Sequence, residues 1–546
     1  MKRMMQFLLT AVSAALLGLW TGCGNSAKVE SRPAAECKAF ADYERYTPVQ
    51  VTSLDDVPEA CQAILLTDGS DCICPEYDDE EMLYYCTSVS SFYTFPMTDC
   101  FEYIVNVPTE EEGDALQKLS ERDLKRVGIL GIHFGDLDAL SHMEHLESLW
   151  ITGCDFTVSF LGDFPALTDL EISYSNIDGL GRITDISTLQ RLTLDTTDIT
   201  NLGGIQKLTN LSKLSLSGSH IHSLKPLRTM TQLTSLDLSG QTAYNKRIQP
   251  DISPLAGMQN LRTLGLGMNS DGVKHLETLS ELHALENLSL LDCSLKSAEP
   301  VENLTNLKAL DLTANHITDL EPLRGLTSLE ILRLHNNEIY DLSPLTELQS
   351  LRVLTVGSNT DLIDISPLEH LQALEEFSAY ACGKLRTITA LQNKKSLKRL
   401  TLSGTQAVDP EILSTDTNLE ELLLEGTVVE ETDFLTNFPN LRKLDLTNTK
   451  IKDTEPIMKL HRLESLSVAG TRVKSIEGIS GLTSLRELNI SGTDIESIEE
   501  LYQLGELRTL KVLNMHNIEK EALTELKTEI VRNGGTCEIS SWASSN

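Results

Sequence analysis

Cysteine is the residue type in this chain whose spacing could do chemistry, and six of the 11 cysteines crowd one segment ahead of residue 108. Cys72-x-Cys74 could begin a zinc site, but no second Cys or His pair follows at zinc-finger spacing. In an exported chain, an even set of clustered cysteines instead predicts a disulfide framework, whose pairing the sequence leaves open. The candidate disulfide cysteines are Cys37, Cys61, Cys72, Cys74, Cys86 and Cys100.

The N-terminus predicts that the chain is exported. Lys2 and Arg3 precede an apolar stretch at 7–19 that is short for a membrane-spanning helix, and small residues follow it before Cys23. We therefore expect a signal peptide over residues 1–22, followed by a polar tether over 23–36.

The residues around Cys23 resemble the lipobox of bacterial lipoproteins, although Trp20 stands where that motif usually has leucine. The resemblance implies that Cys23 is acylated and anchors the protein on the extracellular face of a bacterial membrane. Plain secretion without the lipid is the alternative.

Catalytic and metal-binding motifs were sought and none was found. The acidic run at 78–81 lacks the alternating ligands and glycine of a calcium loop. The chain shows no nucleophile elbow, no HExxH helix and no phosphate-binding loop. We therefore expect a non-enzyme without cofactor or metal, and an unrecognised hydrolase is the third-ranked hypothesis.

The charge balance restricts the partners. The chain carries 45 basic and 80 acidic residues, a net charge of −35. Nucleic acid and anionic lipid headgroups would be repelled over most of such a surface. We expect no nucleic-acid binding, and contact with the membrane through the N-terminal lipid only.

A leucine phrase, L-x-x-L-x-L, recurs about every 22 residues and predicts a repeat architecture. Because its leucines alternate with polar residues, each phrase predicts a short strand with leucines turned inward. We take the second leucine of each phrase as its index residue. The index residues are Val127, Leu149, Leu170, Leu192, Leu214, Leu236, Leu264, Leu288, Leu310, Leu332, Leu354, Phe377, Leu400, Leu422, Leu444, Leu466, Leu488 and Leu510.

Five residues past the index, a small polar side chain must satisfy the backbone of the turn that ends the strand. Asparagine, threonine or serine fills this place in most repeats, for example Asn337 and Thr449. Cys154, Cys293 and Cys382 fall at the same offset, so we interpret them as buried turn residues with a weak donor.

The phrase resembles the leucine-rich repeat family, and the run Asn337, Ile339, Asp341, Leu342, Pro344, Leu345 is similar to the internalin-type repeats of bacterial surface proteins. The resemblance implies an α/β solenoid, a curved parallel β-sheet with short helical or 3-10 returns, plus a small disulfide-rich N-terminal module. We expect the cysteine-rich module at 37–107, repeats at 108–513 and a cap at 514–546.

Side chains that flank each index residue should project from the concave face of the sheet and are candidates for binding. Trp150 is an interface anchor or packs against the N-terminal module. Arg333 and His335 form a basic spot with Tyr380 two repeats on, or an ordinary mixed surface.

The longest interval between index residues, from Leu236 to Leu264, predicts a loop that contains Tyr244, Lys246 and Arg247. This loop either contacts the binding partner or is an insertion without function.

We therefore predict a monomeric, lipid-anchored protein that binds a protein or surface polymer through its concave face. The principal rival is a receptor-like sensor or carrier whose cysteine-rich module binds a small ligand. Neither hypothesis names the partner.

Overall fold

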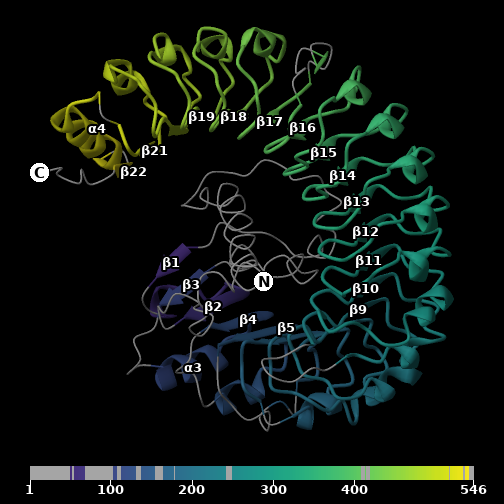
Figure 1. Ribbon diagram of the computed structural model, residues 1–546. Helices are drawn as coiled ribbons and strands as arrows, with labels where there is room; N and C mark the ends of the chain where they lie inside the picture. Colours follow the sequence, from purple (N-terminus) through teal and green to yellow (C-terminus); the bar gives the residue numbers. More distant parts are fainter. Residues whose placement is uncertain are drawn as a thin grey trace, which may run out of the picture. The chain divides into compact units, whose positions relative to one another are not determined.

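The computed structural model describes most of the chain between residues 49 and 539 and divides it into two compact units, residues 1–293 and 294–546. In each unit short parallel strands lie side by side on one side of the repeats, and the 3-10 helices lie on the opposite side (Figure 1). The described residues are 49–51, 54–67, 103–106, 112–130, 137–153, 161, 164–177, 179–241, 249–407, 412–413, 418–515, 517–532 and 535–539.

In the first unit the sheet begins with strands from the N-terminal segment and continues through the repeats. Its strands are β1 (Val49–Val51), β2 (Ala63–Thr67), β3 (Tyr103–Asn106), β4 (Arg126–Leu130), β5 (Ser148–Thr152), β6 (Asp169–Ser173), β7 (Arg191–Thr193), β8 (Lys213–Ser215), β9 (Ser235–Asp237), β10 (Thr263–Gly265) and β11 (Asn287–Ser289).

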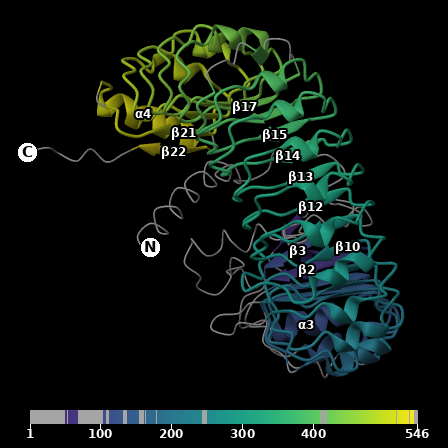
Figure 2. The ribbon, with the colours of Figure 1, turned by 45° about the vertical axis from the view of Figure 1, so that its right-hand side comes forward.

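The second unit has the same pattern, with three-residue strands from β12 to β20, and ends in an α-helix and a last strand (Figure 2). Its strands are β12 (Ala309–Asp311), β13 (Ile331–Arg333), β14 (Val353–Thr355), β15 (Glu376–Ser378), β16 (Arg399–Thr401), β17 (Glu421–Leu423), β18 (Lys443–Asp445), β19 (Ser465–Ser467), β20 (Glu487–Asn489), β21 (Thr509–Val512) and β22 (Thr536–Ile539).

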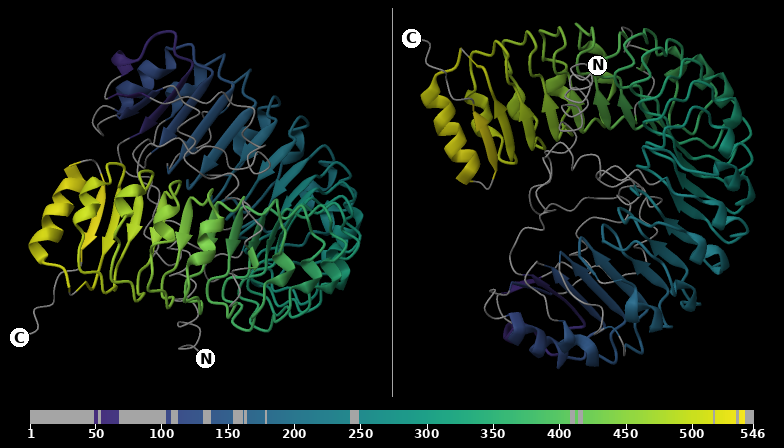
Figure 3. Two further views of the ribbon diagram at one scale, coloured as in Figure 1. Left: turned by 90° about the horizontal axis from the view of Figure 1, so that it is seen from above. Right: turned by 60° about the horizontal axis from the view of Figure 1, so that its bottom comes forward.

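Every predicted index residue is the second residue of a strand, from Val127 in β4 to Leu510 in β21. Within each unit the index residues also pair with one another across neighbouring strands, as Leu332 does with Leu354. The leucines of successive repeats are therefore stacked, and they are almost completely buried. The predicted parallel leucine-rich solenoid is confirmed, and Figure 3 shows the strand ladder within each unit.

The N-terminal segment holds the main difference from expectation. Strand β2 pairs with β4 in parallel, so that Ile64 lies beside Val127, and β3 and β1 add on in turn. These strands extend the repeat sheet of the first unit, where we expected a module apart from it. The apolar sequence of β2 explains this pairing. Ile64 of β2 is fully buried, and an apolar strand needs neighbouring strands on both edges and a covered face.

Between β3 and β4 lies α3 (Glu112–Ser120), an amphipathic helix with Leu116 and Leu119 buried. At the other end, α4 (Lys520–Arg532) buries Leu523, Leu526 and Ile530, and β22 pairs with β21. The helix and strand expected after the last repeat are both present. Such elements cover the apolar ends that a stack of repeats would otherwise expose.

The returns between strands are 3-10 helices. Proline stands at the first turn of several of them, where its missing N–H is no loss, as expected for Pro344 in η14. The 3-10 helices of the first unit are η1 (Leu54–Asp56), η5 (Asp138–His142), η7 (Gly181–Asp185), η8 (Ile205–Lys207), η9 (Lys225–Thr229), η10 (Ser253–Leu255) and η11 (Leu276–Glu281). Those of the second unit are η12 (Glu299–Val301), η13 (Glu321–Leu323), η14 (Ser343–Leu345), η15 (Ser366–Leu368), η16 (Thr389–Leu391), η18 (Asp433–Asn437), η19 (Ile457–Lys459), η20 (Ile479–Gly481) and η21 (Glu499–Gln503).

A buried side chain at the turn after each strand closes the backbone hydrogen bonding, as predicted. Asn337 Oδ1 accepts a hydrogen bond from the N–H of Ile317 in the preceding repeat at 3.0 Å. Its Nδ2 donates to the carbonyl oxygens of Leu312, at 2.9 Å, and Leu334, at 3.3 Å. One amide thus links two repeats.

Threonine at the same place does less. Thr449 Oγ1 donates to the carbonyl oxygen of Leu446 in its own repeat at 2.6 Å, and one hydroxyl proton cannot serve a second carbonyl. Cysteine instead reaches the preceding repeat: Cys293 Sγ lies 3.0 Å from Leu266 O and Cys382 Sγ lies 3.3 Å from Val356 O. The interpretation of these two cysteines as turn residues is confirmed, while Cys154 lies outside the described residues.

Burial also raises the pKa of the Cys382 thiol to about 11, outweighing backbone N–H groups that favour the thiolate. At neutral pH this sulfur is a protonated thiol and an inert core group.

We expect Asn337→Ala to lower the free energy of unfolding by about 2–4 kcal/mol, because it removes hydrogen bonds to two repeats and leaves the N–H of Ile317 without an acceptor in a buried turn. Thr449→Ala, which removes one hydrogen bond, should cost about 1 kcal/mol. Urea unfolding of the two variants measures both values. Equal losses would show that the amide does not couple adjacent repeats.

Candidate binding surface

Strand alternation defines the surface available to a partner. Relative to each index residue, the positions one before, one after and three after turn away from the leucines. We call the surface formed by these positions the strand face of each unit. The sequence prediction of a concave binding face refers to this surface.

Trp150 lies on the strand face of the first unit, between Gly128 of β4 and Glu171 of β6 in register. Its side chain is only 8% exposed. The side chain is therefore buried in this structure, and both interpretations of it, an interface anchor and packing against the N-terminal module, stay predictions. Alternation told us which side of the sheet the ring occupies, but not what would cover it.

Three carboxylates gather further along the same strand face, at Glu171 in β6, Asp195 after β7 and Asp237 in β9. Asp195 Oδ1 accepts hydrogen bonds from Ser215 Oγ at 2.5 Å and from the N–H of Ser217 at 3.0 Å. Ser173 Oγ donates to Glu171 at 3.3 Å. Serine hydroxyls and backbone amides therefore hold these acids in place.

Burial raises the pKa values of all three acids. The pKa of Glu171 rises to about 7, mainly because burial disfavours the carboxylate, although the Ser173 hydrogen bond opposes the shift. The pKa of Asp195 lies well above its usual range, through burial and then the negative charge of Asp237. Burial likewise raises the pKa of Asp237. The search of the sequence for catalytic and binding residues missed this group.

Two basic side chains share this part of the surface. Arg191 of β7 forms an ion pair with Asp169 of β6, with Nη2 2.6 Å from Oδ2. Lys213 of β8 lies beside Arg191 in register. The ion pair neutralises Asp169, so the three remaining acids outnumber the basic groups that face them.

In the second unit the predicted basic spot has to be corrected. Burial lowers the pKa of His335 to about 4, more strongly than the negative charge of Asp311 raises it, and the positive charge of Arg333 lowers it further. The imidazole is therefore neutral at pH 7, and Arg333 alone carries positive charge there. Gly357 makes room for the ring, since a Cβ at that position would lie 2.5 Å from His335 Nδ1.

Tyr380 is partly buried on the same strand face, and its pKa is raised by burial and by the negative charge of Glu425. Burial and the neighbouring Asp445 raise the pKa of Glu425 in turn. Tyr380 thus belongs with an acidic group two and three strands further on. Its predicted grouping with Arg333 as a contact patch stays a prediction.

The insertion with Tyr244, Lys246 and Arg247 lies outside the described residues, so its role also stays a prediction. Gln241, immediately before it, is a residue that the sequence search missed. It occupies the turn position of its repeat, fully buried, and its Nε2 donates to Leu216 O at 2.7 Å while Oε1 accepts from Ile221 N–H at 3.1 Å. Counting five residues from Leu236 would have found it.

The predicted lipid site, Cys23, lies outside the described residues, as do Cys37, Cys72, Cys74, Cys86 and Cys100. Cys61 is described and is buried beside β2. The disulfide framework therefore stays a prediction.

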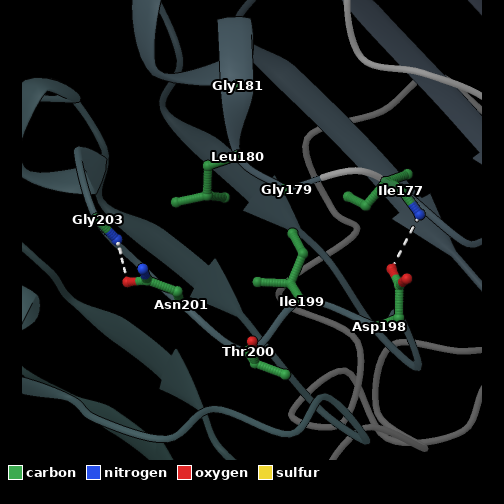
Figure 4. A pocket seen from close by; sticks show the side chains of 9 residues that line it. All are labelled: Ile177, Gly179, Leu180, Gly181, Asp198, Ile199, Thr200, Asn201 and Gly203. Atoms are coloured by element: carbon green, nitrogen blue, oxygen red, sulfur yellow. Dashed lines mark hydrogen bonds between the residues drawn. The ribbon is translucent and has the colours of Figure 1, made fainter.

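A pocket of about 490 Å³ opens between two turns of the first unit (Figure 4). Two of its three polar side chains already serve the backbone: Asp198 Oδ1 accepts from Ile177 N–H and Asn201 Oδ1 from Gly203 N–H, both at 2.9 Å. Glycine and aliphatic residues make up most of the remaining lining. The pocket offers no general acid or base poised for catalysis.

Among the residues that the structure describes, no cluster of His, Cys, Asp or Glu could hold a metal ion. No helix in the same part of the chain is long and apolar enough to cross a membrane.

Comparison with known proteins agrees with the repeat geometry. The family model for leucine-rich repeats in two copies matches residues 283–325 and 461–503. Both matches fall on strand, turn and 3-10 units of the kind described above. The two matched segments are leucine-rich repeats. Proteins built of such repeats are typically non-catalytic binding scaffolds that use extended sheet surfaces. No curated protein matches the chain.

Several solved structures resemble this chain. An internalin of Listeria monocytogenes, InlF, is 25% identical over 60% of this chain and 88% of its own, with a TM-score of 0.47. A leucine-rich repeat protein of Leptospira interrogans is 21% identical over 79% of this chain and 98% of its own, with a TM-score of 0.47. The functional domain of InlJ, from Listeria monocytogenes, is 18% identical over 69% of this chain and 72% of its own, with a TM-score of 0.48.

The raised pKa of Glu171 has a consequence for stability. An acid whose folded pKa of about 7 exceeds its ordinary value of 4.5 stabilises the fold when protonated, and this contribution is lost as pH rises between those values. At pH 8 the free energy of unfolding of Glu171→Gln, measured by urea unfolding, should therefore be about 1–3 kcal/mol higher than that of the parent protein. At pH 4 the two proteins should have similar free energies of unfolding.

Glu321→Gln is the matched control for this experiment. Glu321 is exposed, and its hydrogen bond with Arg324 lowers its pKa, so the variant should gain no stability at pH 8. A gain at pH 8 in both variants would mean that lower net charge, not relief of a buried carboxylate, stabilises the protein.

Proposed function

We propose that this protein is a non-catalytic, extracellular binding protein that holds a macromolecular partner on its strand face and is anchored by a lipid on Cys23. The observation that carries the proposal is the difference between the inward and the outward residue positions of each strand. Inward positions are apolar and buried in repeat after repeat, whereas outward positions vary among charged, polar, aromatic and small side chains. The fold itself requires only the inward set.

The dimensions of the strand face favour a macromolecule over a small metabolite. Strands stack about 4.8 Å apart, so even the strands of one unit extend over several tens of ångströms. The described pocket lies between two turns only, and its Asp198 and Asn201 side chains are engaged by the backbone. A protein or surface polymer can contact many repeats at once.

The exported location is supported by the N-terminal residues alone. The basic pair, the apolar stretch at 7–19 and the small residues before Cys23 have the order of an export signal. A net charge of −35 is consistent with solubility outside the cell.

Partner capture tests the binding proposal. The mature protein, with its N-terminal cysteine replaced by a tag, should retain a defined partner from cell-surface extracts, and Arg333→Ala should weaken retention by about tenfold or more. Arg324→Ala is the matched control, because Arg324 lies directly after 3-10 helix η13, as its C-cap, away from the strand face. Equal loss in the two variants, or no partner at all, would contradict the proposal.

Metabolic labelling with a fatty acid tests the anchor. The parent protein should incorporate label and fractionate with membranes, and Cys23→Ser should lose both properties. An unlabelled parent that is recovered in the medium would establish plain secretion, leaving the binding proposal unaffected.

A further inference from the structure

One row of the strand face differs from the others along a short stretch. This row contains the residue directly before each index residue, which strand alternation turns away from the leucine stack. From Arg126 to Thr509 the residue in this row is charged or polar in every repeat except three consecutive ones. Those three repeats carry Ala309, Ile331 and Val353, which we call the aliphatic stripe.

The aliphatic stripe is continuous and accessible. Ala309 of β12 pairs with Ile331 of β13, and Ile331 pairs with Val353 of β14, in parallel register. Neighbouring strands lie about 4.8 Å apart, so these side chains are direct neighbours on one face of the sheet. All three side chains are partly exposed. A single partner segment can therefore contact them together.

The fold does not require aliphatic residues in this row. Further along the second unit the same row holds ion pairs between adjacent strands: Arg399 Nη2 lies 2.5 Å from Glu376 Oε2, and Lys443 Nζ lies 3.0 Å from Glu421 Oε1. Isoleucine and valine favour strands, but alanine does not, so strand propensity does not explain all three residues. Contiguous exposed apolar side chains, unlike single ones, mark interaction sites.

The charges around the stripe balance one another. Arg352, directly before β14, places Nε 2.7 Å from Glu375 Oε1 and Nη1 3.8 Å from Glu330 Oε2. The neighbouring His335 is neutral at pH 7. The charged residues directly before β12 to β15, with those directly after the index residues of β12 and β13, comprise three bases, Lys308, Arg333 and Arg352, and three acids, Asp311, Glu330 and Glu375.

A locally neutral surface is unusual for this chain, which carries 80 acidic and 45 basic residues. It selects the chemistry of what binds. Aliphatic side chains neither donate nor accept hydrogen bonds, so the stripe offers nothing to the hydroxyl groups of a polysaccharide. A charged segment would lose hydration there without gaining an opposite charge. Apolar side chains of an uncharged polypeptide segment gain from burial against the stripe and lose little.

We propose that the aliphatic stripe docks apolar side chains from an uncharged segment of the partner polypeptide. The inference rests on the proposed function, because it states the chemistry of the partner at one place on the strand face. Arg333 and Asp311, in register beside the stripe, would then contact polar groups that flank the docked segment.

A peptide-binding experiment tests the stripe. The probe is a fluorescent glycine–serine peptide with leucine at three alternate positions, measured by anisotropy at about 0.15 M salt so that distant charges are screened. Ile331→Thr with Val353→Thr makes the stripe polar and keeps the β-branched shape that suits a strand. The matched control is Tyr340→Thr with Ile363→Thr, which removes two apolar side chains, 62% and 58% exposed, from outside the strands of the same unit.

The dissociation constant of the peptide should rise about tenfold for the stripe variant and less than about twofold for the control. Equal weakening of the two variants would overturn the proposal in favour of unspecific apolar attraction. Absence of binding by the parent protein would also overturn it, as would equal binding of a peptide with serine in place of leucine.

A conservative swap guards against a packing artefact. Ile331→Val with Val353→Ile keeps the stripe apolar, so the peptide should bind within about twofold of its affinity for the parent protein. A loss as large as in the stripe variant would mean that disturbed packing, not polarity, causes the effect, and the proposal would fall. Thermal unfolding of every variant confirms that each is folded.

Other occupants of the stripe would be recognised by separate measurements. Binding of phosphatidylcholine vesicles that the stripe variant loses would assign the stripe to lipid and overturn the proposal. Self-association of the parent protein in sedimentation, abolished in the stripe variant, would assign the stripe to a second copy of the chain and overturn it equally.

Partner capture separates this proposal from the function on which it rests. If the stripe variant retains the partner from extracts undiminished and Arg333→Ala loses it, the binding function stands and the stripe falls. If the parent protein retains no partner from extracts, yet the leucine peptide binds it and not the stripe variant, the proposed function fails and the docking site remains.

Discussion

The structure depends on burying, in every repeat, the backbone turn that follows the strand. Inward leucines can stack only if the chain bends back at once, and the bend carries N–H and C=O groups into an apolar interior. A single buried side chain meets that demand each time. Asn337 reaches the N–H of one repeat and carbonyls of two, while Gln241 does equivalent work where a longer reach is needed. Without these side chains, burial of the leucines would leave backbone N–H and C=O groups of the turns without hydrogen-bond partners.

Because the demands of the fold are met on the inward side, the strand face can bear groups that would be unfavourable elsewhere. Glu171 and Asp195 are examples, since burial raises the pKa values of both carboxyl groups. Such groups lower stability unless something pairs with them. Their place on the outward side of strands, and not in the leucine stack, is consistent with a role in contacting another molecule.

Sequence alone was enough for the parts of the molecule that repeat. The spacing of leucines located every index residue within a strand, and the offset of five located the buried turn residues, including Cys293 and Cys382. These positions are predictable because each repeat meets the same local constraint. The strand β2 was not recognised, since its apolar run does not follow the leucine phrase and lies among cysteines that suggested another architecture. The burial of Trp150 and the neutrality of His335 depend on what packs against each side chain, which periodicity does not encode.

The change from asparagine to threonine along the second unit has a mechanical meaning. Asn315, Asn337 and Asn359 belong to consecutive repeats, whereas Thr405, Thr427, Thr449, Thr471 and Thr493 follow later and donate within their own repeats. In a quasi-linear stack, cooperativity is the sum of couplings between nearest neighbours. The later repeats are therefore joined by fewer side-chain hydrogen bonds, and local unfolding of the second unit starts among them. The repeats linked by asparagine unfold less readily, so they limit how far that unfolding extends along the unit.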